Sequence, residues 1–335
     1  MKKTALCQKL GIEYPILSAG LGGGMAGPEL AAAVSSAGGI GVLGMLGVPP
    51  QQIRENIARV RAATDKPFAV NLVLPLMQGN EVETCLEEKV PVLVFFWGDV
   101  TPYVAEAHRH GTQVIVQVGS VEEARRAAAA GVDAIMAQGV EAGGHVRGTT
   151  ALSILVPSVV EAVQPVPVVA TGGIADGRGL VAALDLGAQA VSMGTRFLCS
   201  DEAQVARVYK ERVVQSTAED TVRTTLFDIG WPDAPHRTLR NKAVTEWEAA
   251  GRPPSGQRPG EGSTIGRVEL AAIPGMAIDV LRYSTIPPLP GFDGDIEYAV
   301  LYAGQSCSLI HDIKPAGQIV RDIMRQADAI FAARS

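Results

Sequence analysis

Short runs of apolar residues recur along the first 200 residues of the chain, separated by stretches with apolar residues at helical spacing. Each run and the helical stretch after it take about 20–30 residues, which is typical of a strand–helix unit. Eight such units predict an α/β fold, a closed parallel (β/α)8 TIM barrel. The predicted strands are Tyr14–Ala19, Gly39–Leu43, Phe68–Leu72, Val90–Phe96, Gln113–Val118, Asp133–Ala137, Val166–Thr171 and Ala190–Met193. The predicted helices include Pro28–Ala37, Pro50–Ala63, Glu81–Lys89, Pro102–His110 and Val121–Ala130.

The pattern changes after residue 200. Residues 201–250 are charged and compatible with helix, and residues 251–265 are rich in Gly and Pro, which is typical of a loop. The amphipathic stretch Ile313–Ala333 suits the last helix of the barrel. We therefore predict two domains, a barrel formed by 1–200 plus 299–335 and a smaller, mainly helical, substrate-side domain, 201–298, inserted after strand eight.

Glycines follow the last two predicted strands. Gly172 and Gly173 come directly after strand seven, and Gly194 and Thr195 come directly after strand eight. Backbone N–H groups at such turns bind anions, and the loops after strands seven and eight are the usual phosphate site of this barrel. The alternative is that these glycines only make tight turns.

The loop after strand six reads AQGVEAGGHVRG over residues 137–148. Its glycines allow the backbone to approach a flat ligand, and His145 is the ionisable group there that suits proton transfer near neutral pH. Glu141 either orients this loop by hydrogen bonding or is simply solvated. None of the other histidines forms a metal-binding motif with His145, so we expect no metal.

The loop after strand one carries glycines in the G-x-G-x-x-G spacing at Gly22, Gly24 and Gly27. A dinucleotide fold would need an acidic residue at the end of strand two, where this chain has Leu43-Gly44. We therefore interpret the first loop as backbone that packs against the ring system of a cofactor.

Composition and net charge limit the classes of binding partner and the cellular compartment that we expect for this protein. The net charge of −6 argues against nucleic acid as a partner. No apolar run is long enough to predict a membrane span, and four scattered cysteines predict free thiols in a reducing compartment. We expect a cytoplasmic protein.

Seven motifs together resemble the nitronate monooxygenase family, formerly called 2-nitropropane dioxygenases. They are YPILSAGLGGG, AAAVSSAGGIGVLG, DKPFAVNL, AQGVEAGGH, VVATGGIADGRG, AVSMGTRF and YAGQS, in order along the barrel. The resemblance implies a barrel that holds noncovalent FMN and oxidises alkyl nitronates, with nitroalkanes as further candidate substrates, using O2 to give a carbonyl compound and nitrite. A homodimer is one candidate assembly.

The resemblance also implies roles for single residues. His145 would be the catalytic base, and Gly172, Gly173, Gly194 and Thr195 would bind the FMN phosphate. The remaining expected FMN contacts are Ala19, Gly20, Leu21, Asn71, Gln117, Gln138, Gly143, Tyr302 and Gln305.

Three alternatives stay open. The flavin-dependent enoyl-acyl-carrier-protein reductases share the barrel and the EAGGH, GGIADG and GTRF motifs, so the alternative enzyme is an NAD(P)H-dependent flavin reductase of an enoyl thioester or quinone. A non-catalytic flavin-binding protein is the second alternative. The third is a flavin-free phosphate-binding barrel, which is disfavoured because no strand end offers an obvious Schiff-base lysine.

Overall fold

The computed structural model describes residues 3–270 and 275–334. Its centre is a barrel of eight parallel strands, so the predicted TIM barrel is confirmed. Backbone hydrogen bonds between Ile16 and Ile40, and between Ser18 and Ile40, close the sheet by joining its first and last strands. In neighbour order the strands are β1 (Ile16–Ser18), β9 (Ala190–Met193), β8 (Val168–Thr171), β6 (Ala134–Gln138), β5 (Gln113–Val118), β4 (Val92–Phe96), β3 (Phe68–Val73) and β2 (Gly41–Gly44).

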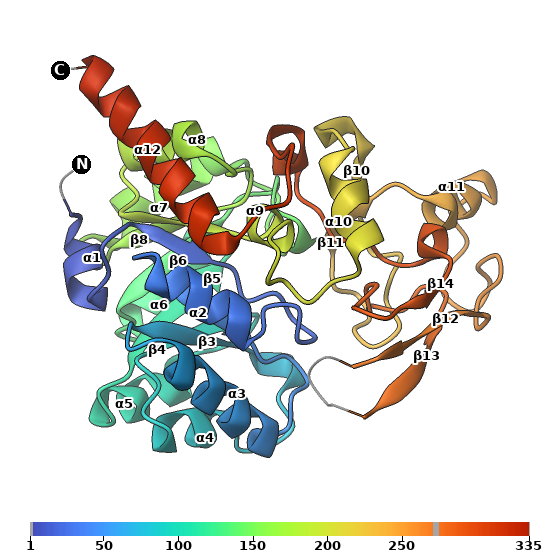
Figure 1. The fold of residues 1–335 in the computed structure, drawn as a ribbon, viewed down its shortest axis with the longest axis horizontal. Coiled ribbons are helices and arrows are strands. Elements are labelled where there is room, and N and C mark those ends of the chain that lie inside the picture. The colour runs from blue at the N-terminus through green and yellow to red at the C-terminus, as the bar shows by residue number, and fades with distance from the viewer. Residues whose placement is uncertain (1–2, 271–274, 335) are drawn as a thin grey trace.

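Helices surround the barrel (Figure 1). Proline at the first position starts α2 and α3, and the side chain of Asp176 caps α8 by accepting the Gly179 N–H. The long C-terminal helix α12 packs against α8 and α2, which completes the ring. The helices are α2 (Pro28–Ser36), α3 (Pro50–Ala63), α4 (Glu81–Glu87), α5 (Thr101–Arg109), α6 (Val121–Ala129), α7 (Leu152–Val163), α8 (Gly177–Asp185) and α12 (Ala316–Arg334).

Two apolar layers hold this architecture together. Outward-facing strand residues pack against the ring of helices and form the larger cluster. Inward-facing residues such as Leu17, Val94 and Met136 fill the barrel, and Leu6 and Leu10 of the short helix α1 (Ala5–Leu10) belong to the same cluster. The helix α1 therefore closes the N-terminal end of the barrel and leaves the C-terminal ends of the strands for a site.

The segment between β9 and α12 is mixed rather than mainly helical, so that part of the prediction was wrong. Residues 221–224 and 236–239 form paired strands within a stretch that the sequence had favoured as helix, because strands this short show no clear alternation. Its main elements are α10 (Arg207–Val214), β10 (Thr221–Thr224), β11 (His236–Leu239), α11 (Lys242–Ala249), β12 (Thr264–Glu269), β13 (Ala277–Leu281) and β14 (Asp293–Gly294). The 3-10 helices of the chain are Leu74–Leu76, Ala218–Asp220, Ile296–Tyr298 and Gln305–Leu309. The domain boundaries stay a prediction.

A two-residue strand links this segment to the barrel. Strand β7 (Gly144–His145) lies in the loop after β6 and pairs antiparallel with β11, which in turn pairs with β10. The segment thus forms a sheet with the loop that carries the predicted base. Among the described residues, no helix is both long and apolar enough to cross a bilayer.

Candidate active site

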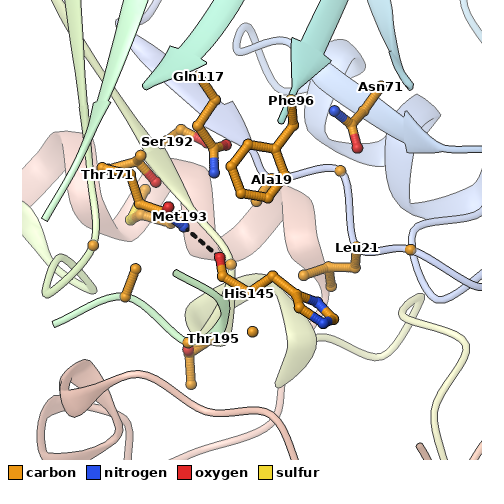
Figure 2. Close-up of a pocket in the computed structure, with 18 of the residues that line it drawn as sticks. Ala19, Leu21, Asn71, Phe96, Gln117, His145, Thr171, Ser192, Met193 and Thr195 are labelled. Carbon is orange, nitrogen blue, oxygen red and sulfur yellow. Dashed lines mark hydrogen bonds between the residues drawn. The ribbon is translucent and has the colours of Figure 1, made fainter. Parts of the chain in front are cut away.

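A cavity opens at the C-terminal ends of the barrel strands, as Figure 2 shows. His145 lines this cavity, as do nearly all residues predicted to contact the cofactor. Gln305 is not among the lining residues, and its backbone N–H donates to the Glu141 carbonyl oxygen at 2.9 Å. The predicted contacts that line the cavity are Ala19, Gly20, Leu21, Asn71, Gln117, Gln138, Gly143, Gly172, Gly173, Gly194, Thr195 and Tyr302.

The position of His145 is fixed by its backbone. Its register partner in β11 is His236, and its carbonyl oxygen accepts a hydrogen bond from the Gln138 amide at 3.0 Å, the dashed line in Figure 2. The imidazole Nε2 atom is buried and has no hydrogen-bond partner in the described part of the chain. A buried polar atom without a partner is costly unless a ligand satisfies it, so Nε2 is an unused hydrogen-bonding group in the lining of the cavity.

His236 is fully buried and His145 is partly buried, and both imidazoles are neutral near pH 7. Burial, and to a smaller extent His236, lowers the pKa of His145 to about 3, and burial lowers the pKa of His236 to about 4. The carbonyl oxygen of Ala234 can only accept, so the Nδ1 atom of His236, 3.0 Å away, carries the proton. His145 is therefore unprotonated over the physiological pH range.

The glycine loop after β8 has the backbone that a phosphate site needs. Gly172 and Gly173 have φ values of +105° and +70°, which favour glycine. A Cβ on Gly172 would lie 3.0 Å from the Cβ of Ala142, so a side chain would crowd the neighbouring loop. Gly194, which caps the short helix α9 (Thr195–Leu198), and Thr195, which begins it, line the same cavity. The two predicted phosphate loops therefore converge on one place.

Polar atoms next to these loops also suit a flavin. The Ser192 hydroxyl and the Gln138 side-chain oxygen are buried without a hydrogen-bond partner among the described residues, and both residues line the cavity. Asn71 donates its amide to the Val94 carbonyl oxygen at 2.9 Å. A ligand with a polar ring edge and a terminal phosphate would satisfy the unpaired atoms, so the residues present fit this cofactor class.

Contacts within the structure show what Glu141 does in the loop after β6 and why Gly20 stands in the loop after β1. Both carboxylate oxygens of Glu141 accept the Leu152 N–H, at 3.0 and 3.1 Å, so Glu141 orients its loop against the start of α7. In the first loop, a Cβ on Gly20 would lie 2.3 Å from the Cβ of Asn71. Glycine at this position therefore allows the backbone to reach the cavity wall beside Asn71.

Several lining residues could not be identified from the sequence. Phe96 ends β4 and projects toward the region of His145 in Figure 2. Trp231 comes from the inserted segment, and its ring lies 4.2 Å from that of His145. Its sequence context, Gly230-Trp231-Pro232, indicates only an interruption of helix. Among the described residues that line the cavity there is no Asp, Glu, Lys or Arg.

Comparison with known proteins places these features in context. Residues 3–83 and 77–326 match the nitronate monooxygenase family. A (3aS,4S,5R,7aS)-5-hydroxy-7a-methyl-1-oxo-octahydro-1H-indene-4-carboxyl-CoA dehydrogenase of Mycobacterium tuberculosis is 39% identical over 253 residues, which cover 75% of this chain and 70% of the relative.

Two solved structures cover the chain almost completely. FabK from Thermotoga maritima has a TM-score of 0.79 and 35% identity, over 99% of this chain and 98% of that chain. A nitroalkane oxidase from Streptomyces ansochromogenes also has a TM-score of 0.79, with 27% identity, over 99% of this chain and 100% of that chain.

Proposed function

Since the chain belongs to the nitronate monooxygenase family and is an oxidoreductase, we propose that it oxidises alkyl nitronates with bound FMN and O2. The products are a carbonyl compound and nitrite. A neutral nitroalkane is also a substrate if the site first removes its α-proton and so converts it into the nitronate. The observation that carries this proposal is the unpartnered, buried Nε2 atom of neutral His145 beside two converging glycine loops.

The chain's own groups would hold the cofactor. The backbone at Gly172, Gly173 and Gly194, with Thr195, would bind the phosphate, and Asn71, Gln117 and Gln138 would contact the ring system. The glycine turns suit one terminal phosphate, which favours FMN. The chemistry that a bound flavin supplies is electron transfer from the substrate carbon to molecular oxygen.

His145 acts on the substrate at its Nε2 atom. The neutral ring accepts the α-proton of a nitroalkane, and the carbon–hydrogen electron pair moves into the nitro group to form the nitronate. A substrate that enters as a nitronate needs no such step. The described cavity lining contains no Asp, Glu, Lys or Arg. Amide and hydroxyl groups would therefore stabilise the negative charge of a bound nitronate.

We also propose that residues 201–298 form the substrate-side domain. Strand β11 holds the His145 strand in place, and Trp231 from the same segment lines the cavity. The segment would thus complete a site whose cofactor half is supplied by the barrel.

A second candidate function is the NAD(P)H-dependent reduction of an enoyl thioester. It is favoured by the similarity to a carboxyl-CoA dehydrogenase and to FabK. The uncharged cavity lining also suits a reacting thioester, which carries no charge of its own.

One experiment separates the two functions. Purified holoprotein is given 1-nitrobutane nitronate in air while nitrite is measured, and separately NADPH and crotonyl-CoA without oxygen while flavin absorbance is followed. Nitrite release without need of NADPH supports nitronate oxidation. Bleaching by NADPH with recovery on crotonyl-CoA, and no nitrite, contradicts it and favours the reductase.

A further inference from the structure

An aromatic wall lies over the proposed base. Trp231 is 9% exposed, and its ring is tilted by 31° to that of His145. It also makes an edge contact with Trp97 at a centroid distance of 5.0 Å. Trp231 and His145 line the same cavity, so the indole is an apolar surface available to the substituent of a substrate whose reacting carbon lies at the free Nε2 atom.

The barrel supplies the other half of this wall. Trp97 follows β4 and has a φ of +63°, a left-handed conformation that a bulky residue adopts only when its surroundings hold it there. Trp97 is not itself a lining residue, but its ring packs edge-on against that of Phe96, which lines the cavity, at a centroid distance of 5.2 Å. Val73 and Leu46 also line the cavity, and Ala234 and Leu76 belong to the same apolar cluster.

The described cavity lining contains no Lys or Arg that could pair with a negatively charged substituent of a substrate. Arg147 lies with its guanidinium 5.6 Å from the centre of the Trp97 ring, but it is paired with Glu123 at 2.9 Å and is not a lining residue. Moving a carboxylate from water to such a surface without a partner is strongly unfavourable. An apolar group gains from the same transfer.

We propose that Trp231 and Phe96, both packed against Trp97, form the specificity-determining wall of the site and select substrates whose substituent next to the reacting carbon is uncharged and apolar. This inference rests on the proposed function for the identity of the reacting group. The preference for an apolar substituent does not depend on the reaction, because it applies to any ligand that occupies the space beside His145. Substrates that carry a carboxylate in the same position are rejected.

The direct test compares two nitronates of similar shape. In the 3-methylbutyl nitronate an isopropyl group stands where propionate 3-nitronate has a carboxylate. The wild-type holoenzyme is expected to show a kcat/KM about 10²-fold higher for the apolar nitronate. Lengthening linear nitronates from ethyl to butyl is expected to raise kcat/KM about fourfold for each methylene. Values for the apolar and anionic nitronates within about threefold of each other would overturn the proposal.

Variants connect the preference to Trp231. Trp231→Ala is expected to flatten the chain-length dependence, and Trp231→Arg is expected to shift the ratio at least tenfold toward the carboxylate substrate. A gain of preference cannot result from misfolding. The matched control is Trp247→Ala, since Trp247 lies on α11 and donates its indole N–H to Pro253 rather than lining the cavity. An unchanged ratio in Trp231→Arg, or an equal shift in the control, would overturn the assignment.

A binding measurement keeps this inference separate from the proposed function. Flavin absorbance is titrated with 3-methyl-1-butanol and with 3-hydroxypropanoate, which cannot undergo the nitronate reaction. Tighter binding of the alcohol supports the wall even if no nitronate is turned over, in which case only the proposed function fails. Equal binding of the two probes overturns the wall even if nitronates are turned over.

Discussion

His145 and His236 are register partners across the junction between the barrel and the inserted segment, and their rings lie 5.5 Å apart. One side chain faces the cavity with a free nitrogen, and the other is fully buried with both ring nitrogens hydrogen-bonded. The pairing fixes the backbone of the proposed base from the side of the segment. Burial of both rings also makes the stability of the protein depend on pH.

The first prediction concerns acid stability. Below the unfolded-state pKa of about 6.5 the unfolded chain binds protons that the two native rings, with pKa values of about 3 and 4, do not bind. The free energy of unfolding should therefore be fully maintained above pH 6.5 and fall by about 1.4 kcal/mol per pH unit and per histidine between about pH 6 and 4. Urea denaturation across this range measures the slope.

Matched substitutions show whether these two residues cause the slope. His145→Asn and His236→Asn should each make the fall shallower, whereas His311→Asn, at an exposed position, should not. The same slope in all three variants and the wild type would mean that carboxylates alone cause the acid sensitivity.

The second prediction tests the phosphate loop. Gly173→Asp should strongly reduce flavin content while the barrel stays folded, because it places a carboxylate beside the phosphate and a side chain at a φ of +70°. Gly111→Asp is the control, since Gly111 has a similar φ of +76° with open space around it, in the loop between α5 and β5. Flavin absorbance per protein and circular dichroism measure the two effects. Full flavin occupancy in Gly173→Asp would place the phosphate elsewhere.

The third prediction concerns the anchor of the inserted segment. Arg258 is only 6% exposed, and its guanidinium pairs with Asp228 at 2.7 Å and donates to the Leu226 carbonyl oxygen at 2.8 Å. Arg258→Ala leaves the carbonyl oxygen of buried Leu226 and the partly buried Asp228 carboxylate without this partner, and should lower the free energy of unfolding by about 3 kcal/mol. Since Asp228 precedes the Trp231 loop, KM should rise as well.

A surface arginine provides the comparison for Arg258. The exposed pair between Arg252 and Glu248 should contribute little, so Arg252→Ala should change the free energy of unfolding by about 0.5 kcal/mol or less. Urea denaturation of both variants measures the two changes in the free energy of unfolding. Equal effects would show that burial of the Arg258 network does not matter.

The barrel, and most of the residues that its strand ends contribute to the cavity lining, could be predicted because their signals are local. Each strand is a short apolar run, Gly172 and Gly173 directly follow the end of β8, and His145 lies seven residues after the end of β6. A parallel barrel brings all carboxyl ends of its strands to one face, so residues far apart in the chain can be assigned to one site.

The substrate half could not be predicted because it depends on long-range pairing. Strand β7 has two residues, too few for any periodicity, and its partner β11 lies about 90 residues further on. Trp231 follows a glycine and precedes a proline, a context that indicates a turn and gives no direction for its ring. Only the contact with His145 shows that it lines the cavity.

The most direct test of the central claim is the activity of His145→Asn on a nitroalkane and on its nitronate. Asparagine keeps a polar side chain but cannot act as a base near pH 7. We predict that kcat/KM for 1-nitrobutane falls by about 10²–10⁴-fold, while that for its nitronate falls much less and flavin content is unchanged. Equal losses on both substrates would make His145 a binding residue, and no loss on either would contradict its role in the reaction.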